Sequence, residues 1–197
     1  VGAGHTCVIT LSGLPFCWGD STTGQVGDND ANVVTKGYNP SPRPVSQTPL
    51  TEGKAFTGLD AGGGHTCGIS GGLGFCWGSN LSSQMGDGTV GASVNGSPAY
   101  PLIATPTPVN NAAFGGRTLT ALSSGGGGPV TSQTCGIASG KAYCWGENYN
   151  GESGGTSNIV VRIPDQVCVP FFGCFPGPVW FSFASPPVAV TGTISAK

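Results

Sequence analysis

Eight cysteines and two histidines are the residues of this 197-residue chain with the widest range of chemistry. Zinc sites need closely spaced ligand pairs such as Cys-x-x-Cys. The sequence has none, and its His–Cys neighbours are His5-Thr6-Cys7 and His65-Thr66-Cys67. We therefore expect no metal site. An even number of regularly spaced cysteines predicts disulfides, which favours an extracellular or cell-surface location.

Catalytic motifs are missing from the sequence. Nine acidic residues are scattered, and no nucleophile elbow, zinc-protease helix or phosphate-binding loop occurs. Gly125 to Gly128 lack a following Lys-Ser/Thr and indicate a turn. Asp28-Asn29-Asp30 carries enough oxygen to hold calcium, but two carboxylates in a loop are more often solvated. We predict no catalytic residue, no cofactor and no enzyme activity.

The composition indicates an all-β chain rich in loops. The 36 glycines and 16 prolines exclude a helical bundle. Charged residues make up 8% of the chain and the net charge is -2, which argues against nucleic acid as a partner. The longest uncharged aromatic stretch, 166–184, contains several prolines and glycines, so we expect no membrane insertion.

A motif recurs three times along the chain. It reads Gly-His-Thr-Cys at residues 4–7, Gly-His-Thr-Cys at 64–67 and Ser-Gln-Thr-Cys at 132–135, and each copy is followed by an aromatic-Cys-Trp-Gly run. Polar turns of related sequence come next, at 24–28, 83–87 and, degraded, at 151–155. The copies lie 60 residues apart from His5 to His65 and 68 residues apart from His65 to Gln133. Short β runs between Gly-rich turns, repeated at such distances, are typical of propeller blades. We divide the chain into units 1–60, 61–128 and 129–197, the last with an aromatic, Pro-rich tail.

Each motif predicts a β-hairpin closed by a disulfide. Pairing Cys67 with Cys76 or Cys135 with Cys144 leaves a two-residue loop, and pairing Cys7 with Cys17 leaves three residues ending in Gly13. In this register the two-residue hairpins place each cysteine pair at a non-hydrogen-bonded position, where a disulfide fits. The remaining pair would be Cys168–Cys174.

Alternation along the strands places the aromatic residues on the face opposite the cysteines. In the second and third hairpins an aromatic ring then lies across from a glycine, Phe75 from Gly68 and Tyr143 from Gly136. We expect this aromatic set to form the core between blades rather than an exposed sugar-binding surface. The set comprises Phe16, Trp18, Phe75, Trp77, Tyr143 and Trp145.

The run Gly-His-Thr-Cys … Cys-Trp-Gly … Gly-Gln-x-Gly-Asp resembles the repeat of the regulator of chromosome condensation family, in a secreted, cysteine-paired variant. The resemblance implies blades of four antiparallel strands, usually seven in a ring, so three units predict part of a larger propeller or an open arc. It also implies that the His and Gln of the motif serve packing and turn hydrogen bonds. Gln133 and Glu152 depart from the motif. The family's nucleotide-exchange activity does not transfer to a disulfide-rich, nearly uncharged chain.

Ser/Thr-Pro stretches separate the hairpins and predict extended polyproline-type surface segments, of a kind often glycosylated in secreted proteins. The candidate glycosylation sites are Ser41, Thr48, Asn80, Asn95, Thr105, Thr107 and Ser185. For both asparagines an ordinary turn residue is the competing interpretation.

Two functional hypotheses follow from these features. The first is a non-catalytic structural protein of an extracellular wall, appendage or fibre, whose partners are other protein chains, with copies of itself as one option. The second is a propeller recognition module that binds a protein or a glycan, as a receptor ectodomain or an inhibitor does.

Overall fold

The computed structural model describes residues 1–30, 37–47, 55–89, 93–94, 97–98, 103–129, 131–148, 150–153, 159–163, 166–169, 173–176 and 179–189. For the strands β7, β8 and β13 to β16 it describes the backbone and, among their side chains, only Pro187. The described residues are nearly all β, with one 3-10 helix, η1 (Asn111–Phe114). None of the described helices is long and apolar enough to cross a membrane.

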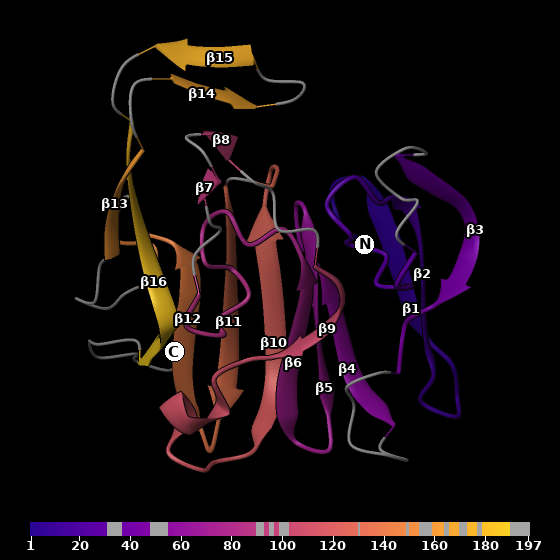
Figure 1. The fold of residues 1–197 in the computed structure, drawn as a ribbon. Helices are drawn as coiled ribbons and strands as arrows, with labels where there is room; N and C mark the ends of the chain where they lie inside the picture. Colours follow the sequence, from indigo (N-terminus) through magenta and orange to yellow (C-terminus); the bar gives the residue numbers. More distant parts are fainter. Residues whose placement is uncertain are drawn as a thin grey trace.

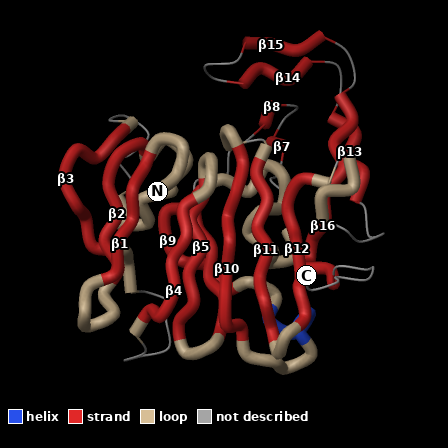
Figure 2. Tube along the Cα trace, turned by 180° about the vertical axis from the view of Figure 1, so that it is seen from behind, coloured by secondary structure: helices blue, strands red, loops and turns tan. Residues whose placement is uncertain are grey.

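Three antiparallel sheets stand side by side in chain order (Figures 1 and 2). The first sheet has the order β1-β2-β3, the second β4-β5-β6-β9 and the third β10-β11-β12-β16-β13. The first comprises β1 (His5–Ile9), β2 (Pro15–Asp20) and β3 (Tyr38–Pro44); the second comprises β4 (Phe56–Ala61), β5 (His65–Ser70), β6 (Leu73–Gly78) and β9 (Ile103–Pro108). The third comprises β10 (Leu119–Gly126), β11 (Ser132–Ala138), β12 (Lys141–Glu147), β13 (Ile159–Ile163) and β16 (Val179–Ala189).

Two small hairpins complete the described strands. They are β7 (Ser93–Val94) with β8 (Ser97–Pro98), and β14 (Gln166–Val169) with β15 (Gly173–Pro176). The β14–β15 hairpin lies beyond the ends of the three sheets in both views (Figures 1 and 2).

The hairpin registers are those expected from the cysteine spacing. Cys67 lies opposite Cys76, Cys135 opposite Cys144 and Cys7 opposite Cys17, and a disulfide joins each pair. Glycines with positive φ make the tight turns possible, at 78° for Gly72 and 74° for Gly140. The backbone register also sets Cys168 opposite Cys174, but their side chains lie outside the described residues, so that bridge stays a prediction.

Where they are described, the Pro-rich stretches lie in strands, which corrects the expectation of polyproline-type segments. β3 and β9 pair with the Cys-Trp-Gly strand of their own sheet, and Ser185-Pro186-Pro187 lies within β16, which pairs with β12. Proline lacks an N–H, so it fits an edge strand where that group would face away from the sheet. β3 has such an edge, since it ends the first sheet.

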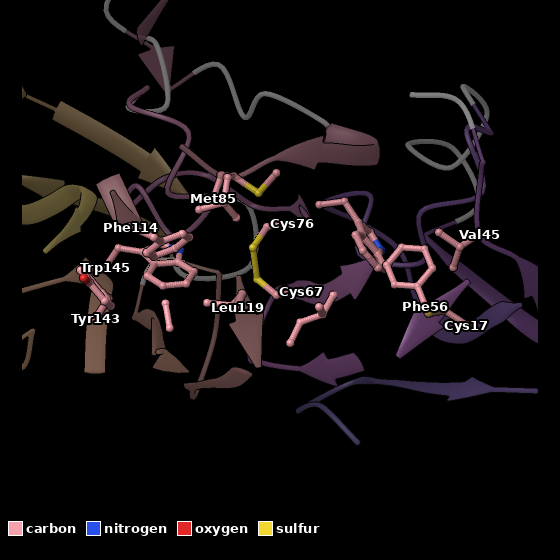
Figure 3. Packing of buried hydrophobic residues seen from close by; sticks show 14 of the residues in the cluster. Cys17, Val45, Phe56, Cys67, Cys76, Met85, Phe114, Leu119, Tyr143 and Trp145 are labelled. Atoms are coloured by element: carbon pink, nitrogen blue, oxygen red, sulfur yellow. A yellow bond between two sulfur atoms is a disulfide. The ribbon is translucent and has the colours of Figure 1, made fainter. Parts of the chain in front are cut away.

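The core runs through the junctions between the sheets (Figure 3). Phe56 packs edge-on against Phe75 and Trp77, with ring centroids 6.4 and 6.1 Å away. Phe114 of η1 contacts Tyr143 in the same way at 5.1 Å. Phe75 lies opposite Gly68 and Tyr143 opposite Gly136, as expected. The ring closest to the open side of Gly68 is that of Phe56, which a methyl group at Gly68 would meet at 2.6 Å. The strand that leads into the sheet therefore covers this glycine.

Candidate functional site

The junction between the first and second sheets centres on one backbone oxygen, that of Gln25. It accepts a hydrogen bond from the Thr66 hydroxyl at 2.8 Å and another from the Trp77 indole nitrogen at 3.0 Å. Thr66 in turn binds Nε2 of His5 at 2.7 Å. The Thr66 hydroxyl donates its one proton to the oxygen of Gln25. Nε2 of His5 must therefore be the donor in the hydrogen bond between His5 and Thr66.

The second junction repeats the pattern one motif later. Nε2 of His65 binds the Thr134 hydroxyl at 2.8 Å, and the Trp145 indole nitrogen donates to the backbone oxygen of Gln84 at 2.9 Å. Gly27 and Gly86 each lie against the indole of the following sheet, since a methyl group on either would come within 2.6 Å of it. A side chain at either glycine would therefore push the two sheets apart.

The turn that carries each central oxygen is held by its own side chains. Oε1 of Gln25 accepts from the Thr23 N–H at 2.9 Å, and Oε1 of Gln84 accepts from the Ser82 N–H at 2.6 Å. Glu152 does the same in the third sheet, with Oε2 accepting from the Asn150 N–H at 2.8 Å. The degraded third motif therefore keeps the turn conformation.

Burial keeps both junction histidines neutral. Desolvation lowers the pKa of His5 to about 4, against a smaller opposite effect of Asp20. Desolvation and the neighbouring His5 lower the pKa of His65 to about 3. Nδ1 of each ring is buried and has no hydrogen-bond partner, so a proton added there would find no acceptor.

These pKa values predict loss of stability in acid. The unfolded chain binds protons at its histidines below pH about 6.5, whereas the folded chain does not until about pH 4 and 3. The free energy of unfolding should therefore decrease as the pH falls through this window, by up to about 1.4 kcal/mol per pH unit for each histidine. Urea unfolding at pH 7, 6, 5 and 4 measures this slope.

The matched control is His65→Gln, because Gln133 stands at the same place in the third sheet. The variant should be less stable at pH 7 but lose less stability on acidification than the parent chain. If the free energy of unfolding changes equally with pH in the two proteins, His65 is not the cause of the acid destabilisation.

The aromatic set differs between the sheets. Trp77 and Trp145 are fully buried at the two junctions, and Phe75 and Tyr143 are buried beside them. Phe16 and Trp18, in the first sheet, are only half-buried. Among the described residues no backbone oxygen accepts a hydrogen bond from the Trp18 indole, whereas the oxygens of Gln25 and Gln84 accept from Trp77 and Trp145.

Most glycosylation candidates stay untested. Ser41 is exposed, and Thr105 and Thr107 are half-buried. Thr48 and Asn95, and the side chain of Ser185, lie outside the described residues.

For Asn80 the structure supports the turn interpretation and not glycosylation. The residue is 1% exposed, and its amide nitrogen donates to the Thr89 hydroxyl at 2.8 Å. Its Oδ1 accepts from the Met85 N–H at 3.1 Å, so a glycan has no access and Asn80 serves the turn.

The acidic loop at Asp28 is held by an ion pair. Nε of Arg43 lies 3.1 Å from Oδ2 of Asp28, and a second Arg43 nitrogen lies 4.0 Å from Asp30. A guanidinium thus occupies the position that the calcium alternative would give to the metal. Within the described residues no group of three or more His, Cys, Asp or Glu gathers to hold a metal ion.

Comparison with solved structures identifies the architecture. Prp20p from Saccharomyces cerevisiae matches with a TM-score of 0.63 at 16% identity over 98% of this chain. The fold is an RCC1-like β-propeller repeat. Yeast RCC1 (Prp20) bound to Kap60 matches with a TM-score of 0.61 at 17% identity, again over 98% of this chain. Human WBSCR16 matches with a TM-score of 0.58 at 17% identity over 75%.

This chain spans less than half of each RCC1-like neighbour: 37% and 42% of the two yeast chains and 32% of the human one. At these identities the likeness shows the fold alone. Prp20p is described with its binding to Gsp1p and histones. No family model and no curated protein sequence matches this chain.

Proposed function

We propose that this chain is a non-catalytic protein-binding module built of propeller blades, and that it works in an extracellular structural assembly such as a wall, appendage or fibre. The observation that carries the proposal is the use of the polar motif residues. The buried His, Thr and Trp side chains of the described sheets bind one another and backbone oxygens across the sheet junctions, so the exposed strands and loops are the surface that remains for a partner.

Two further features support the proposal. Neighbours of the same fold bind proteins, as Prp20p does with Gsp1p and histones and yeast RCC1 with Kap60. Their particular partners are not carried over. The three disulfides persist in oxidising surroundings, which supports an extracellular location.

The hydrogen bonds of the two histidines support a non-catalytic role. His5 and His65 are buried, neutral and bound to threonines across the sheet junctions. Groups held in this way stabilise the stack and do not face a substrate.

We also propose residues 1–60, 61–128 and 129–197 as the repeating units of the sequence. The second and third sheets each begin one strand earlier than their motif, because β4 and β10 lead into them. The strand that completes one blade is thus carried near the end of the preceding unit.

Site-specific photo-crosslinking tests the proposed function. A photoreactive residue replaces Val8, which is 45% exposed on β1, or Ile137, which is 37% exposed on β11. Each protein is then added to the extracellular proteins of the native source. We expect protein adducts from at least one of the two positions, because both side chains are exposed on the described strands. Adducts from neither position, with retention on a glycan array, would overturn protein binding in favour of glycan recognition.

A further inference from the structure

The outer strands of the three sheets lie at the rim of the propeller. Neighbouring sheets contact each other near one end of the strand order, β1 with β4, and β4 and β5 with β10. The strands β3, β9 and β16 lie toward the other end of that order. Further blades would continue the ring through contacts of the first kind, so the rim edges do not depend on how many blades the ring has.

Prolines close the rim edge of the first two sheets. The N–H groups of Val45 and Val109 donate to backbone oxygens of β2 and β6 at 3.0 and 2.9 Å, so both point into their own sheet. Successive residues of a strand direct their backbone groups to opposite sides, so the residue before each valine faces the rim. That residue is the exposed Pro44 in β3 and the exposed Pro108 in β9. Because proline has no N–H, neither position can donate to an added strand.

The third sheet takes an additional strand at its rim edge. β16 pairs with β12 on one side and with β13 on the other. The stretch of β16 that pairs with β13, residues 179–183, contains no proline, in contrast to residues 40–44 and 105–108. A rim edge of this chain thus accepts a strand where its backbone N–H groups are intact.

β13 in turn ends the third sheet, and the register shows which of its backbone groups face outward. Counted from the two-residue turn between β11 and β12, Gly146 directs its backbone groups to β16, where it lies opposite Ala184. The neighbouring Phe183 therefore directs its groups to β13, whose first residue is its partner. The same alternation along β13 turns the N–H and C=O of Val160 and Arg162 away from β16.

A second copy of the same strand satisfies these outward groups. They lie on either side of Val161, so an antiparallel β13 related by a two-fold axis through Val161 sets each Val160 opposite the Arg162 of the other copy. Each such pair exchanges both of its hydrogen bonds. The sequence Ile-Val-Val-Arg-Ile suits this pairing, because it is mostly β-branched and contains no proline, glycine or acidic residue. Among the described rim strands, β13 is the one that offers a free edge without proline.

We propose that this chain self-associates through β13, which pairs antiparallel with β13 of a second copy about Val161 and joins the third sheets of both copies into one. Pro44 and Pro108 restrict this strand pairing to the third sheet. The inference rests on the proposed function in taking the partner to be a protein, and it names that partner as the chain itself.

Opposite charges at position 160 test the register directly. Val160→Glu sets a carboxylate opposite each Arg162 of the other copy, whereas Val160→Lys sets an ammonium there. Both changes replace the same β-branched residue with a long charged one, so each variant is the control for the other. In sedimentation velocity of the disulfide-bonded chain, the dimer dissociation constant should be about tenfold lower for the Glu variant. High salt should reduce this difference.

A proline at the same position tests the edge itself. Val160→Pro removes an outward N–H, as Pro44 and Pro108 do, and leaves the hydrogen bonds between β13 and β16 in place. The parent chain should dimerise with increasing concentration, and this variant should stay monomeric. Val160→Thr keeps the N–H and a β-branched side chain, so it should dimerise like the parent. Circular dichroism confirms that each variant keeps the parent fold.

Three results would overturn the inference: a monomeric parent chain, a dimer that persists in Val160→Pro, and equal dissociation constants for the Glu and Lys variants. Should Val160→Pro not fold, the Glu and Lys variants decide, because both keep every backbone N–H. A monomeric parent chain that still forms photo-crosslinked adducts with extracellular proteins would contradict the self-association and leave the proposed function standing.

Discussion

Replacing Trp77 with alanine is expected to lower the free energy of unfolding by about 3 to 5 kcal/mol. The side chain is fully buried, packs on Phe56 at 6.1 Å and donates to the backbone oxygen of Gln25 at 3.0 Å. The substitution leaves a cavity at the junction and removes one of the donors to that oxygen. Urea unfolding followed by far-ultraviolet circular dichroism measures the loss, because that signal comes mainly from the backbone.

Trp18→Ala is the matched control, since Trp18 occupies the same position in the first sheet. It is half-buried and lacks a preceding sheet among the described residues, so we expect a loss of about 1 kcal/mol or less. Trp77→Phe keeps an aromatic ring and removes the indole donor. Its loss of unfolding free energy should lie between those of Trp77→Ala and Trp18→Ala. Equal losses at positions 18 and 77 would mean that the sheet junction contributes little to the stability of this position.

Removal of the Cys67–Cys76 disulfide should have the second largest effect. Deleting a native disulfide from a small domain typically costs about 2 to 5 kcal/mol, and closure of a loop this short accounts for about 3 kcal/mol in the chain-entropy model. Both cysteines are fully buried in the core between the second and third sheets. The double variant Cys67→Ala/Cys76→Ala, compared with the parent by urea unfolding, gives the value.

Comparison with the Cys7–Cys17 pair separates two contributions to that loss, the entropy of loop closure and the packing of the buried cysteines. It spans 10 residues against 9 for Cys67–Cys76, so the entropic part should be nearly the same. Cys7 is only half-buried, so less packing is lost in Cys7→Ala/Cys17→Ala. We expect a smaller loss for this variant, and a loss as large as that of the buried pair would assign the effect to loop closure alone.

The hairpins and their disulfides could be predicted because local rules determine them. In an antiparallel pair the turn length fixes which residues face each other, so the cysteine spacing sets the register. The Pro-rich strands were missed for the opposite reason. Prolines at 40, 42 and 44 favour an extended chain, but only the neighbouring β2 shows that the chain completes a sheet.

The junctions could be predicted only in part. The tryptophans indicate a buried interface, because such large apolar rings recur in each hairpin on the face of the strand that points away from the cysteines. Their hydrogen-bond partner is a backbone oxygen, and residue type does not indicate where a backbone oxygen points. The recurrence of threonine opposite each tryptophan, as in Thr66 and Trp77, was the available signal for that contact.

Asn80 illustrates the limit of a short motif. Asn80-Leu81-Ser82 fits a glycosylation sequon, yet the same three residues form the turn that buries Asn80 and aligns Gln84. Spacing alone does not separate a turn asparagine from an accessible one, because the difference lies in the distant residue Thr89 that binds its amide.

Hydrogen exchange of the indole N–H groups, followed by NMR, tests most directly the claim that backbone oxygens of one sheet hold the tryptophans of the next. Trp18→Phe, Trp77→Phe and Trp145→Phe variants assign the signals. The structure predicts slow exchange for Trp77 and Trp145, whose indoles are buried and bound to Gln25 and Gln84, and fast exchange for Trp18. Fast exchange at Trp77 and Trp145, or equal protection at Trp18, would contradict the account.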